Sequence, residues 1–452
     1  MSPSVLLQRV EVDGAIVDCR IQGVIVQDVA PGLAPREQER VIAGNGAALL
    51  PGLVDHHIHI RAAAAARISI DVTAVQDLTT LSATPGSGWL RLIGAGDGVT
   101  RARLDTAFPD RPVRAQHRSG ALWTLNSAAV ELLASGLDAT QRESGQLWRS
   151  DDHLHRLLVD VHAWADPDVT GLVMRLAQLG VTHLTDATPG LDQDAVAQLR
   201  QEMPQHLLAL GIGGTAPAPL KIMLADHEDI DLEGLAECIR SSHFAGRPVA
   251  IHAISAAGLV VTVTALADAG TWPNDRIEHA AVCDDVTADR IADLGVTVTT
   301  QPGIWARRGR EYLGAVPAHE RPLLWRYASL LDRGVRVVAS SDAPYGDPDP
   351  WRTIQSACTR DLVDDVGGAM DERVAPETAL RSMLGDPLDP SGTMRRVQPG
   401  AAADLVLLHK PLAVALESVV LDGISPVRAV WLRGQLLPAA TDDEIMPIGG
   451  RR

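Results

Sequence analysis

Short apolar segments alternate with helical segments over most of the chain, and this alternation restricts the fold more than any other feature. A strand, a helix and a second strand in succession give parallel strands whose faces are covered by helices. The predicted strands of this region are residues 181–186, 206–212, 220–224, 248–252, 276–279, 296–300 and 335–342. So many strand–helix units favour an α/β fold, with a closed (β/α)8 TIM-like barrel rather than an open sheet.

The two ends of the chain predict a second, smaller β-structure. Short strands occupy residues 5–30, with a hairpin turn at Asp13 and Gly14. Matching apolar strands lie at residues 403–408 and 427–432. Neither set can bury a core alone, so we expect both to form one small β-sandwich. The predicted division of the chain is a β-sandwich of residues 1–48 and 398–440, a barrel of residues 49–397 with an insertion at about residues 82–156, and a tail of residues 441–452.

Composition and charge are those of an ordinary globular chain. Of its 452 residues, 46% are hydrophobic and 21% are charged. The net charge of −17 argues against a nucleic acid or an anionic membrane as partner.

No stretch approaches the ~18 apolar residues of a membrane span, and the first residues lack a signal-peptide pattern. The cysteines form no Cys-x-x-Cys pair, which favours a reducing, cytoplasmic location. The sequence leaves the oligomeric state open, a homodimer included.

Three histidines follow the apolar run of residues 49–54. In a strand, His57 and His59 point to one face while His56 points to the other. Two imidazoles about 7 Å apart along one face are well placed to bind one metal ion. Burying histidines without partners is costly, so a metal site is favoured over a core that contains them by chance.

In a barrel the active site lies at the C-terminal ends of the strands, and chemically competent side chains fall there in this sequence. They are His57, His59, Lys221, His252, His279 and Asp342. This set of imidazoles, one amine and one carboxylate suits a binuclear centre of divalent metal ions. Zn²⁺ is the first candidate, and Mn²⁺, Fe²⁺ and Ni²⁺ are the others.

Four further segments carry a family resemblance: residues 104–113, 117–123, 276–280 and 340–344. Together with the strand-end residues, they resemble the amidohydrolase superfamily over roughly residues 45–440. Within it, the chain is similar to the branch that includes N-substituted formamide deformylases. The resemblance implies the barrel fold and a metal site, and it is much less specific for the substrate.

The resemblance also implies a role for each ligand. His57, His59 and Asp342 would hold the more buried metal ion, His252 and His279 the second, and a carbamylated Lys221 would bridge the two. An anionic bridge is needed because two neighbouring dications repel each other. Lysine is otherwise found only at Lys410, and an arginine could not serve because it stays protonated. The alternative is a lysine without a role in the site, either at the surface or with its apolar stem in the barrel and its charged end in solvent.

The mechanism that follows is hydrolysis of a C–N amide bond by a metal-activated hydroxide, with Asp342 as proton shuttle. An N-formyl or N-acyl amide is the expected substrate, and a cyclic amide or a lactone stays open. His117, Trp123 and Trp305 are assigned to the substrate pocket, with residues 303–310 as a loop that faces the substrate.

Two other classes of protein remain open. A deaminase of amino-heterocycles has the same fold, but it needs a glutamate near His252, which is followed here by Ala-Ile-Ser-Ala-Ala. A non-catalytic barrel protein is the second alternative, although all the ligand positions are filled. Outside the site, Asp349 is predicted to cap a helix that begins with Pro350.

Overall fold

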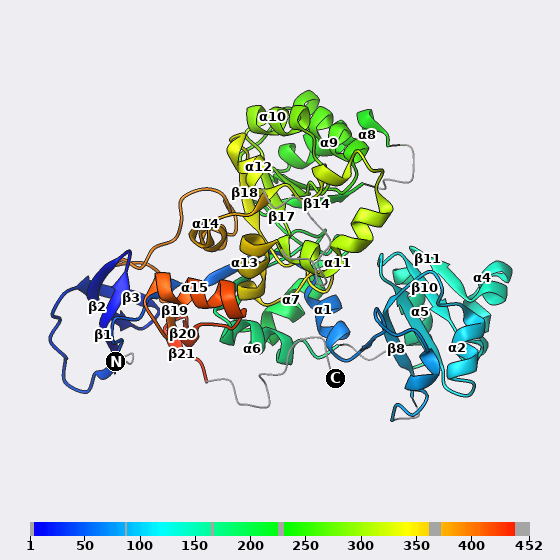
Figure 1. The fold of residues 1–452 in the computed structure, drawn as a ribbon, viewed down its shortest axis with the longest axis horizontal. Coiled ribbons are helices and arrows are strands. Elements are labelled where there is room, and N and C mark those ends of the chain that lie inside the picture. The colour runs from blue at the N-terminus through cyan, green and yellow to red at the C-terminus, as the bar shows by residue number, and fades with distance from the viewer. Residues whose placement is uncertain (1–3, 86–87, 164–166, 225–229, 361–371, 439–452) are drawn as a thin grey trace. The chain divides into compact units, whose positions relative to one another are not determined.

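The computed structural model describes residues 4–85, 88–163, 167–224, 230–360 and 372–438 (Figure 1). The predicted tail of residues 441–452 lies outside these ranges. The chain divides into two compact units, one built from residues 1–60 and 169–446 and the other mainly from residues 61–168. None of the helices in the described part of the chain is both long and apolar enough to cross a membrane.

The first unit contains two parallel sheets that follow the chain order. One has the strand order β13-β12-β6, and the other has the order β14-β15-β16-β17-β18. Their bounds are β6 (Leu53–Ile58), β12 (Val181–Asp186), β13 (His206–Ala209), β14 (Leu220–Met223), β15 (Val249–Ala253), β16 (Arg276–His279), β17 (Thr297–Thr300) and β18 (Arg336–Ala339). All the pairs within these two sheets are parallel, as the alternation of strands and helices predicts.

Helices precede or follow these strands along the chain (Figure 1). They are α6 (Thr170–Gln178), α7 (Gln193–Glu202), α8 (Leu232–Phe244), α9 (Ala256–Ala269), α10 (Asp285–Leu294), α11 (Pro302–Ala315), α12 (Tyr327–Asp332) and α13 (Pro350–Thr359). Side-chain caps begin several of them, and α13 begins as predicted, with Asp349 as N-cap and Pro350 in the first turn. Residues 303–310 are helical, so the predicted loop is wrong; Pro302 supplies a helix-starting residue at that point.

Backbone hydrogen bonds also join the outer edges of the two parallel sheets. The amide of Lys221 donates to the carbonyl of Leu210 at 2.7 Å, which connects β14 to the end of β13. At the opposite edges, the amide of Asp342 donates to the carbonyl of His57 at 2.7 Å. The amide of His59 donates to the carbonyl of Ala343 at 2.9 Å. These bonds hold the end of β6 beside the end of β18.

Gly52 divides the apolar run that precedes the histidines between two sheets. Residues on its N-terminal side form β5 (Leu49–Pro51), which pairs with β19 (Leu405–Leu408), and residues on its C-terminal side form β6. A Cβ at Gly52 would overlap the side chain of Thr182, so only glycine fits where the strand passes β12.

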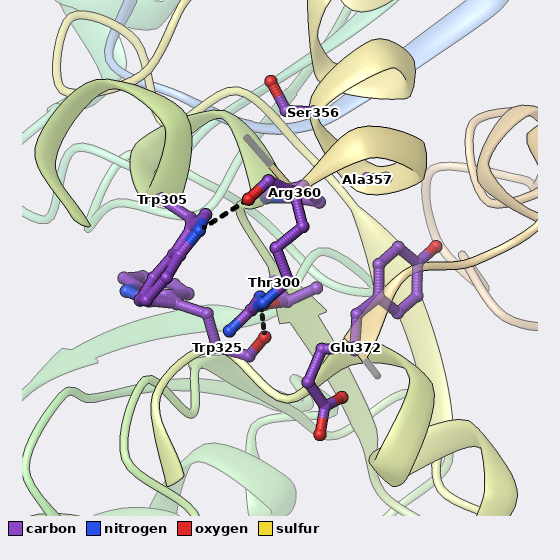
Figure 2. Close-up of a pocket in the computed structure, with 9 residues that line it drawn as sticks. Thr300, Trp305, Trp325, Ser356, Ala357, Arg360 and Glu372 are labelled. Atoms are coloured by element: carbon purple, nitrogen blue, oxygen red, sulfur yellow. Dashed lines mark hydrogen bonds between the residues drawn. The ribbon is translucent and has the colours of Figure 1, made fainter. Parts of the chain in front are cut away.

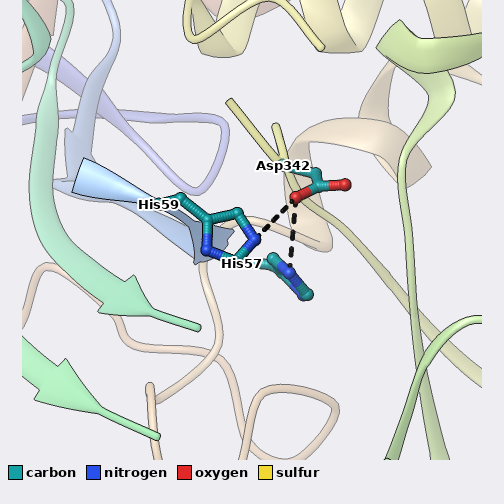
Figure 3. A group of neighbouring side chains, drawn as sticks. All are labelled: His57, His59 and Asp342. Carbon is teal, nitrogen blue, oxygen red and sulfur yellow. Dashed lines mark ion pairs between the residues drawn. The ribbon is translucent and has the colours of Figure 1, made fainter. Parts of the chain in front are cut away.

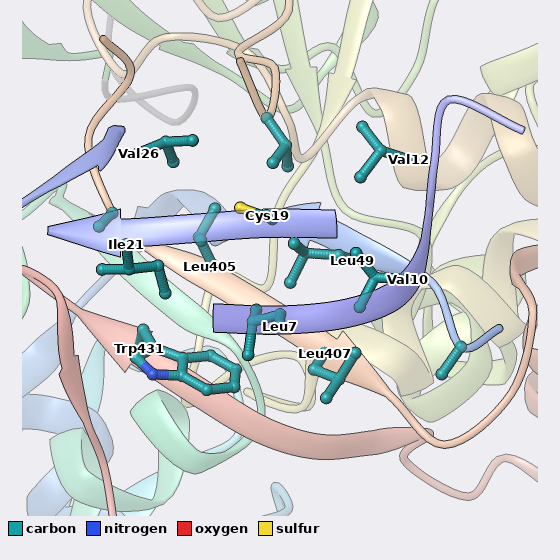
Figure 4. Packing of buried hydrophobic residues seen from close by; sticks show 13 residues of the cluster. Leu7, Val10, Val12, Cys19, Ile21, Val26, Leu49, Leu405, Leu407 and Trp431 are labelled. Carbon is teal, nitrogen blue, oxygen red and sulfur yellow. The ribbon is translucent and has the colours of Figure 1, made fainter. Parts of the chain in front are cut away.

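Two further sheets are built from the two ends of the chain. One has the order β3-β2-β1-β4 and the other has the order β21-β20-β19-β5. Their remaining strands are β1 (Ser4–Val12), β2 (Ala15–Gln22), β3 (Ile25–Ala30), β4 (Arg40–Ala43), β20 (Val427–Leu432) and β21 (Gln435–Leu436), with α14 (Pro376–Arg381) and α15 (Leu412–Asp422) nearby in sequence. Leu7, Ile21, Leu405 and Trp431 are buried in one core between them (Figure 4).

Replacing Trp431 by alanine should lower the free energy of unfolding by about 3–5 kcal/mol, because a fully buried indole leaves a cavity in this core. Urea unfolding would measure the change. Trp148→Ala is the matched control, since Trp148 is 61% exposed and its loss should cost less than about 0.5 kcal/mol. Equal effects of the two substitutions would contradict the central position of Trp431.

The second unit contains a sheet of order β11-β10-β9-β8-β7. Its elements are β7 (Ile70–Asp71), β8 (Leu90–Ala95), α2 (Arg101–Ala107), β9 (Val113–His117), β10 (Leu122–Leu125), α3 (Ser127–Leu133), α4 (Ala139–Ser144), β11 (Gln146–Trp148) and α5 (Asp151–Asp160); α1 (Ile60–Arg67) precedes them. The segment in which the regular alternation is lost, residues 82–156, lies within this unit.

Candidate metal centre

Asp342 and two histidines meet where β6 and β18 end (Figure 3). Oδ1 of Asp342 lies 3.4 Å from Nε2 of His57 and 3.3 Å from Nε2 of His59. One ligand atom from each of the three residues lies within 4.8 Å of the others. The hydrogen bonds between the two strand ends fix this approach, because they tie the backbones of residues 57–59 and 342–343 together.

The other predicted ligands surround this trio. The ring of His279 lies 5.0 Å from that of His57, and the ring of His252 lies 4.6 Å from that of His279, measured between centroids. Nδ1 of His279 is 3.8 Å from Oδ2 of Asp342. Lys221, on β14, is only 6% exposed. Asp186, at the end of β12, is not among the predicted ligands, and its carboxylate accepts hydrogen bonds from the amides of Ile60 and Thr188.

Three residues that the sequence analysis did not single out hold the histidine rings. Nδ1 of His57 contacts a carboxylate oxygen of Glu278. Nδ1 of His59 lies 3.1 Å from Oγ1 of Thr188, and Nδ1 of His279 lies 2.8 Å from Oε1 of Gln301. Partners of this kind fix the orientation and the tautomer of a metal-binding imidazole. Glu278 stands next to His279 in the sequence, which was a signal that it lies at the site.

The hydrogen bonding of His57 creates a place for a cation. An ionised Glu278 can only accept, so His57 carries its proton on Nδ1 and a lone pair on Nε2. That lone pair faces Oδ1 of Asp342, which is another acceptor. Within the described residues, neither atom has a hydrogen-bond partner, and neither has Nζ of Lys221. Buried polar atoms are normally paired, and a divalent ion between the two acceptors would satisfy both.

The electrostatics of the site favour neutral imidazoles at His57 and His279. Burial, with the nearby Lys221 as the next cause, holds the pKa of His57 well below its ordinary value. Burial and the neighbouring His252 do the same to the pKa of His279. Burial also lowers the pKa of Lys221 to about 8. Although burial alone would raise it, the pKa of Glu278 is lowered by Arg276 and Lys221, so this carboxylate stays ionised.

Replacing Glu278 by glutamine should lower the affinity for the metal ion by about 10- to 100-fold, the usual effect of losing such a partner. The amide keeps an acceptor for His57 but removes the negative charge beside it. Competition with a chromophoric chelator would measure the affinity. Glu237→Gln is the matched control, because the side chain of Glu237 is 68% exposed on α8. An unchanged affinity in Glu278→Gln would show that Glu278 only fills space.

Trp305 lies inside the first unit, in a packed environment. Its Nε1 donates to the carbonyl of Arg360 at 3.1 Å, and the Arg360 guanidinium lies 4.2 Å from its ring centroid. Trp305, Trp325 and Glu372 line a cavity of about 10 Å³ with Arg360 (Figure 2). That volume holds about one water molecule, so this cavity is too small for a substrate.

The other two residues assigned to the substrate pocket belong to the second unit. Trp123 is buried there, and its Nε1 donates to Oδ1 of Asp151 at 2.8 Å. His117 lies 3.2 Å from Oδ1 of Asp97 through Nε2, and 2.8 Å from Oγ of Ser119 through Nδ1. The side chains of Trp123 and His117 therefore both contact polar partners inside the second unit.

A second group with metal-binding side chains consists of His183, His206 and Asp404, whose ligand atoms lie within 4.8 Å of one another. Nη1 of Arg395 lies 3.3 Å from Nδ1 of His183, and a guanidinium can only donate. His183 therefore carries its own proton on Nε2, which leaves that ring without a lone pair for a metal. We interpret the group as a structural contact in which His206 hydrogen-bonds Asp404 at 3.0 Å.

Comparison with known proteins gives matches over most of the chain. The model of the amidohydrolase family matches residues 40–210 and 170–438. A Bacillus subtilis (strain 168) protein named as a candidate amidohydrolase, YtcJ, is 24% identical over 409 residues, which cover 72% of this chain and 76% of that protein. The N-substituted formamide deformylase of Arthrobacter pascens is 30% identical over 141 residues, 30% of this chain and 26% of the enzyme.

Solved structures show a related fold. An uncharacterized metal-dependent hydrolase from Pyrococcus horikoshii OT3 superposes with a TM-score of 0.71 at 17% identity, covering 92% of this chain and 99% of that one. Atrazine chlorohydrolase TrzN from Arthrobacter aurescens TC1, solved with zinc, gives a TM-score of 0.58 at 14% identity, with 97% of each chain covered. These likenesses show a TIM-barrel-like α/β fold. With the match of the family model over most of its length, they lead to one conclusion: the chain belongs to the amidohydrolase family.

Proposed function

We propose that this chain is a metal-dependent hydrolase that cleaves the C–N bond of an N-formyl or N-acyl amide, with cyclic amides as a further class. The observation that carries the proposal is the pair of facing acceptors at the strand ends, Nε2 of His57 and Oδ1 of Asp342, 3.4 Å apart. Family membership supports hydrolysis at a C–N bond. The substrate class rests on the partial match to the formamide deformylase.

The proposed ligands are His57, His59, Lys221, His252, His279 and Asp342, holding two divalent ions, with Zn²⁺ as the first candidate. Ions bound there would polarise the amide carbonyl and lower the pKa of a water molecule toward neutrality. Glu278, Thr188 and Gln301 would orient the imidazoles through their Nδ1 atoms.

Lys221 is the proposed bridge. Its neutral Nζ would form a bond to the carbon of CO₂ and release one proton, giving an anionic carbamate. Burial and the absence of a hydrogen-bond partner for Nζ among the described residues support this role. A carbamate would place negative charge between two cations that otherwise repel each other.

Asp342 is the proposed proton shuttle. Oδ1 of its carboxylate lies near His57 and His59, and Oδ2 lies near His279, so the carboxylate is close to a proposed ligand of each metal position. We propose that it accepts the proton of the attacking water and then donates it to the amide nitrogen, which leaves as the amine. Water and amide are thereby converted to a carboxylic acid and an amine.

We also propose that the two parallel sheets form one closed (β/α)8 barrel of residues 49–397, next to a β-sandwich of residues 1–48 and 398–440. The hydrogen bonds between the outer edges of the sheets support closure. The common core of the two terminal sheets supports the sandwich. The assignment of His117, Trp123 and Trp305 to the substrate pocket stays a prediction.

A panel of N-formyl, N-acetyl and cyclic amides, with aminopyrimidines and aminopurines beside them, tests the proposed function. We expect formate, acetate or free amine from the amides, loss of that activity after treatment with a chelator, and its return with Zn²⁺. Liquid chromatography would follow the products, and an enzyme-coupled assay would follow ammonia. Ammonia from the heterocycles, with every amide intact, would replace the proposal by a deaminase.

A further inference from the structure

A buried arginine joins the two parallel sheets of the first unit. Arg276 is the first residue of β16, the strand that ends at His279, and its side chain is only 1% exposed. Nη2 of Arg276 donates a hydrogen bond to the carbonyl of His56, on β6, at 2.7 Å. Because β16 and β6 belong to different sheets, the guanidinium connects one sheet to the other. It therefore links two strands that carry proposed ligands.

The same guanidinium also holds the carboxylate of Glu278. Arg276 and Glu278 stand two residues apart on β16, so their side chains lie on the same face of the sheet. Nε of Arg276 donates to Oε1 of Glu278, and Oε2 of Glu278 contacts Nδ1 of His57. The planar guanidinium can donate in both directions at once. Arg276 is thus anchored on β6 by one nitrogen, while another fixes the carboxylate that faces His57.

The orientation of Glu278 decides which nitrogen of His57 is open to a metal ion. The neutral imidazole carries one proton, either on Nδ1 or on Nε2. A carboxylate oxygen beside Nδ1 favours the proton there, which leaves the lone pair on Nε2. With the proton on Nε2, the ring would instead face Oδ1 of Asp342, 3.4 Å away, as a donor, and the place for the cation would be lost. A carboxylate that is fixed from its other oxygen maintains the first form.

Stability alone is a poor explanation for this pair. Both side chains are buried, and the free-energy cost of removing an arginine and a glutamate from water often exceeds the gain from their attraction. Nη1 of Arg276 also has no hydrogen-bond partner among the described residues. Apolar side chains of similar volume would fill the same space without an unpaired donor. The effect of the pair on His57 explains its presence better.

We propose that Arg276 is a positioning residue of the metal centre: acting through Glu278, it keeps the imidazole of His57 in the form that binds a metal ion through Nε2. This inference rests on the proposed function, because it takes His57 as a ligand. It extends the site to a residue outside the proposed ligand set, three residues before His279 on the same strand.

Arg276→Met should lower the affinity of the full chain for Zn²⁺ about 10- to 100-fold, the usual effect of losing such a partner. Competition with a chromophoric chelator would measure the affinity. Arg276→Lys should be almost as weak, because an ammonium keeps the charge but does not reproduce the fork of the guanidinium. The matched control is an exposed pair on α8, in which Nε of Arg240 donates to Glu237 at 3.0 Å; Arg240→Met should keep full affinity.

A double variant separates positioning from stability. Arg276→Met leaves a buried carboxylate without its cation, so Tm should fall. Replacing Glu278 by glutamine as well removes the unpaired charge, and Tm should return toward that of the wild-type protein. The affinity for Zn²⁺ should stay low and equal that of Glu278→Gln alone, because Arg276 acts through Glu278. A purely structural pair predicts instead that affinity and Tm recover together.

Nitrogen-15 NMR of the histidine-labelled, metal-free chain reads the proposed effect directly, because it reports which ring nitrogen of His57 carries the proton. The spectrum of His57→Gln identifies the signals of that ring by their absence. We expect the proton on Nδ1 in the wild-type protein, and partly on Nε2 in Arg276→Met.

The outcomes separate the two proposals. Unchanged affinity in Arg276→Met, full affinity in Arg276→Lys, recovery of affinity together with Tm in the double variant, or an unchanged position of the His57 proton would each overturn the inference and leave the proposed function intact. If the protein binds no divalent metal ion and cleaves no amide, the proposed function fails and this inference fails with it.

Discussion

The variant Asp342→Asn should fold normally and lose at least about 100-fold in kcat, the usual scale for the loss of a general acid–base. Asp342 has a φ of 49°, a left-handed conformation that asparagine also adopts readily. The backbone bond from its amide to His57 is unaffected by the change. The carboxamide, however, cannot accept the proton of the attacking water.

Steady-state kinetics and circular dichroism on the same preparation would check this expectation. Asp289→Asn is the matched control, because Asp289 is 59% exposed on α10 and should keep full activity. Metal content should be measured in parallel, since Asp342 is also a proposed ligand. Near-normal turnover in Asp342→Asn would remove Asp342 from the proton transfer.

The second large effect is expected for Lys221→Ala, which should hold fewer than two metal ions per chain and lose its activity. The substitution removes the proposed carbamate, and the two cations are then left without an anion between them. Because the missing part is a carboxylate, formate or acetate could enter the vacated space and restore part of the activity. Lys221→Arg should not be rescued, since its guanidinium fills that space and stays charged.

Metal analysis and activity assays with and without added formate would test this expectation. Lys410→Ala is the natural control, because Lys410 is the only other lysine and is exposed. Full metal content and full activity in Lys221→Ala would show that Lys221 is a buried amine without a role in the centre.

That His57, His59 and Asp342 lie together was predictable, because it depends on local sequence at the strand ends. Parallel strands that alternate with helices present their C-terminal ends at one edge, so residues such as His57 and Asp342 are expected together before any contact is known. The resemblance to the amidohydrolase superfamily is confirmed by the family match. Asp349 as the cap of α13 was predictable for the same reason, since a cap involves only its own turn.

The surroundings of the candidate ligands were not predictable, because they depend on contacts between distant parts of the chain. Glu278 is 221 residues from His57, and Thr188 is 129 residues from His59. The division of one apolar run at Gly52 depends on Thr182 of a neighbouring strand. Pro302 was a local signal for the helix around Trp305, whereas tertiary packing placed the indole under Arg360.

Anomalous diffraction from crystals of the zinc-loaded protein, measured on both sides of the zinc absorption edge, tests the central claim most directly. The claim is that His57, His59, Lys221, His252, His279 and Asp342 form one binuclear centre. It predicts two zinc peaks a few ångströms apart among these side chains, with continuous density from Nζ of Lys221 to a carbamate between them. Zinc bound elsewhere, or a fully loaded site from which an unmodified Lys221 points away, would contradict it.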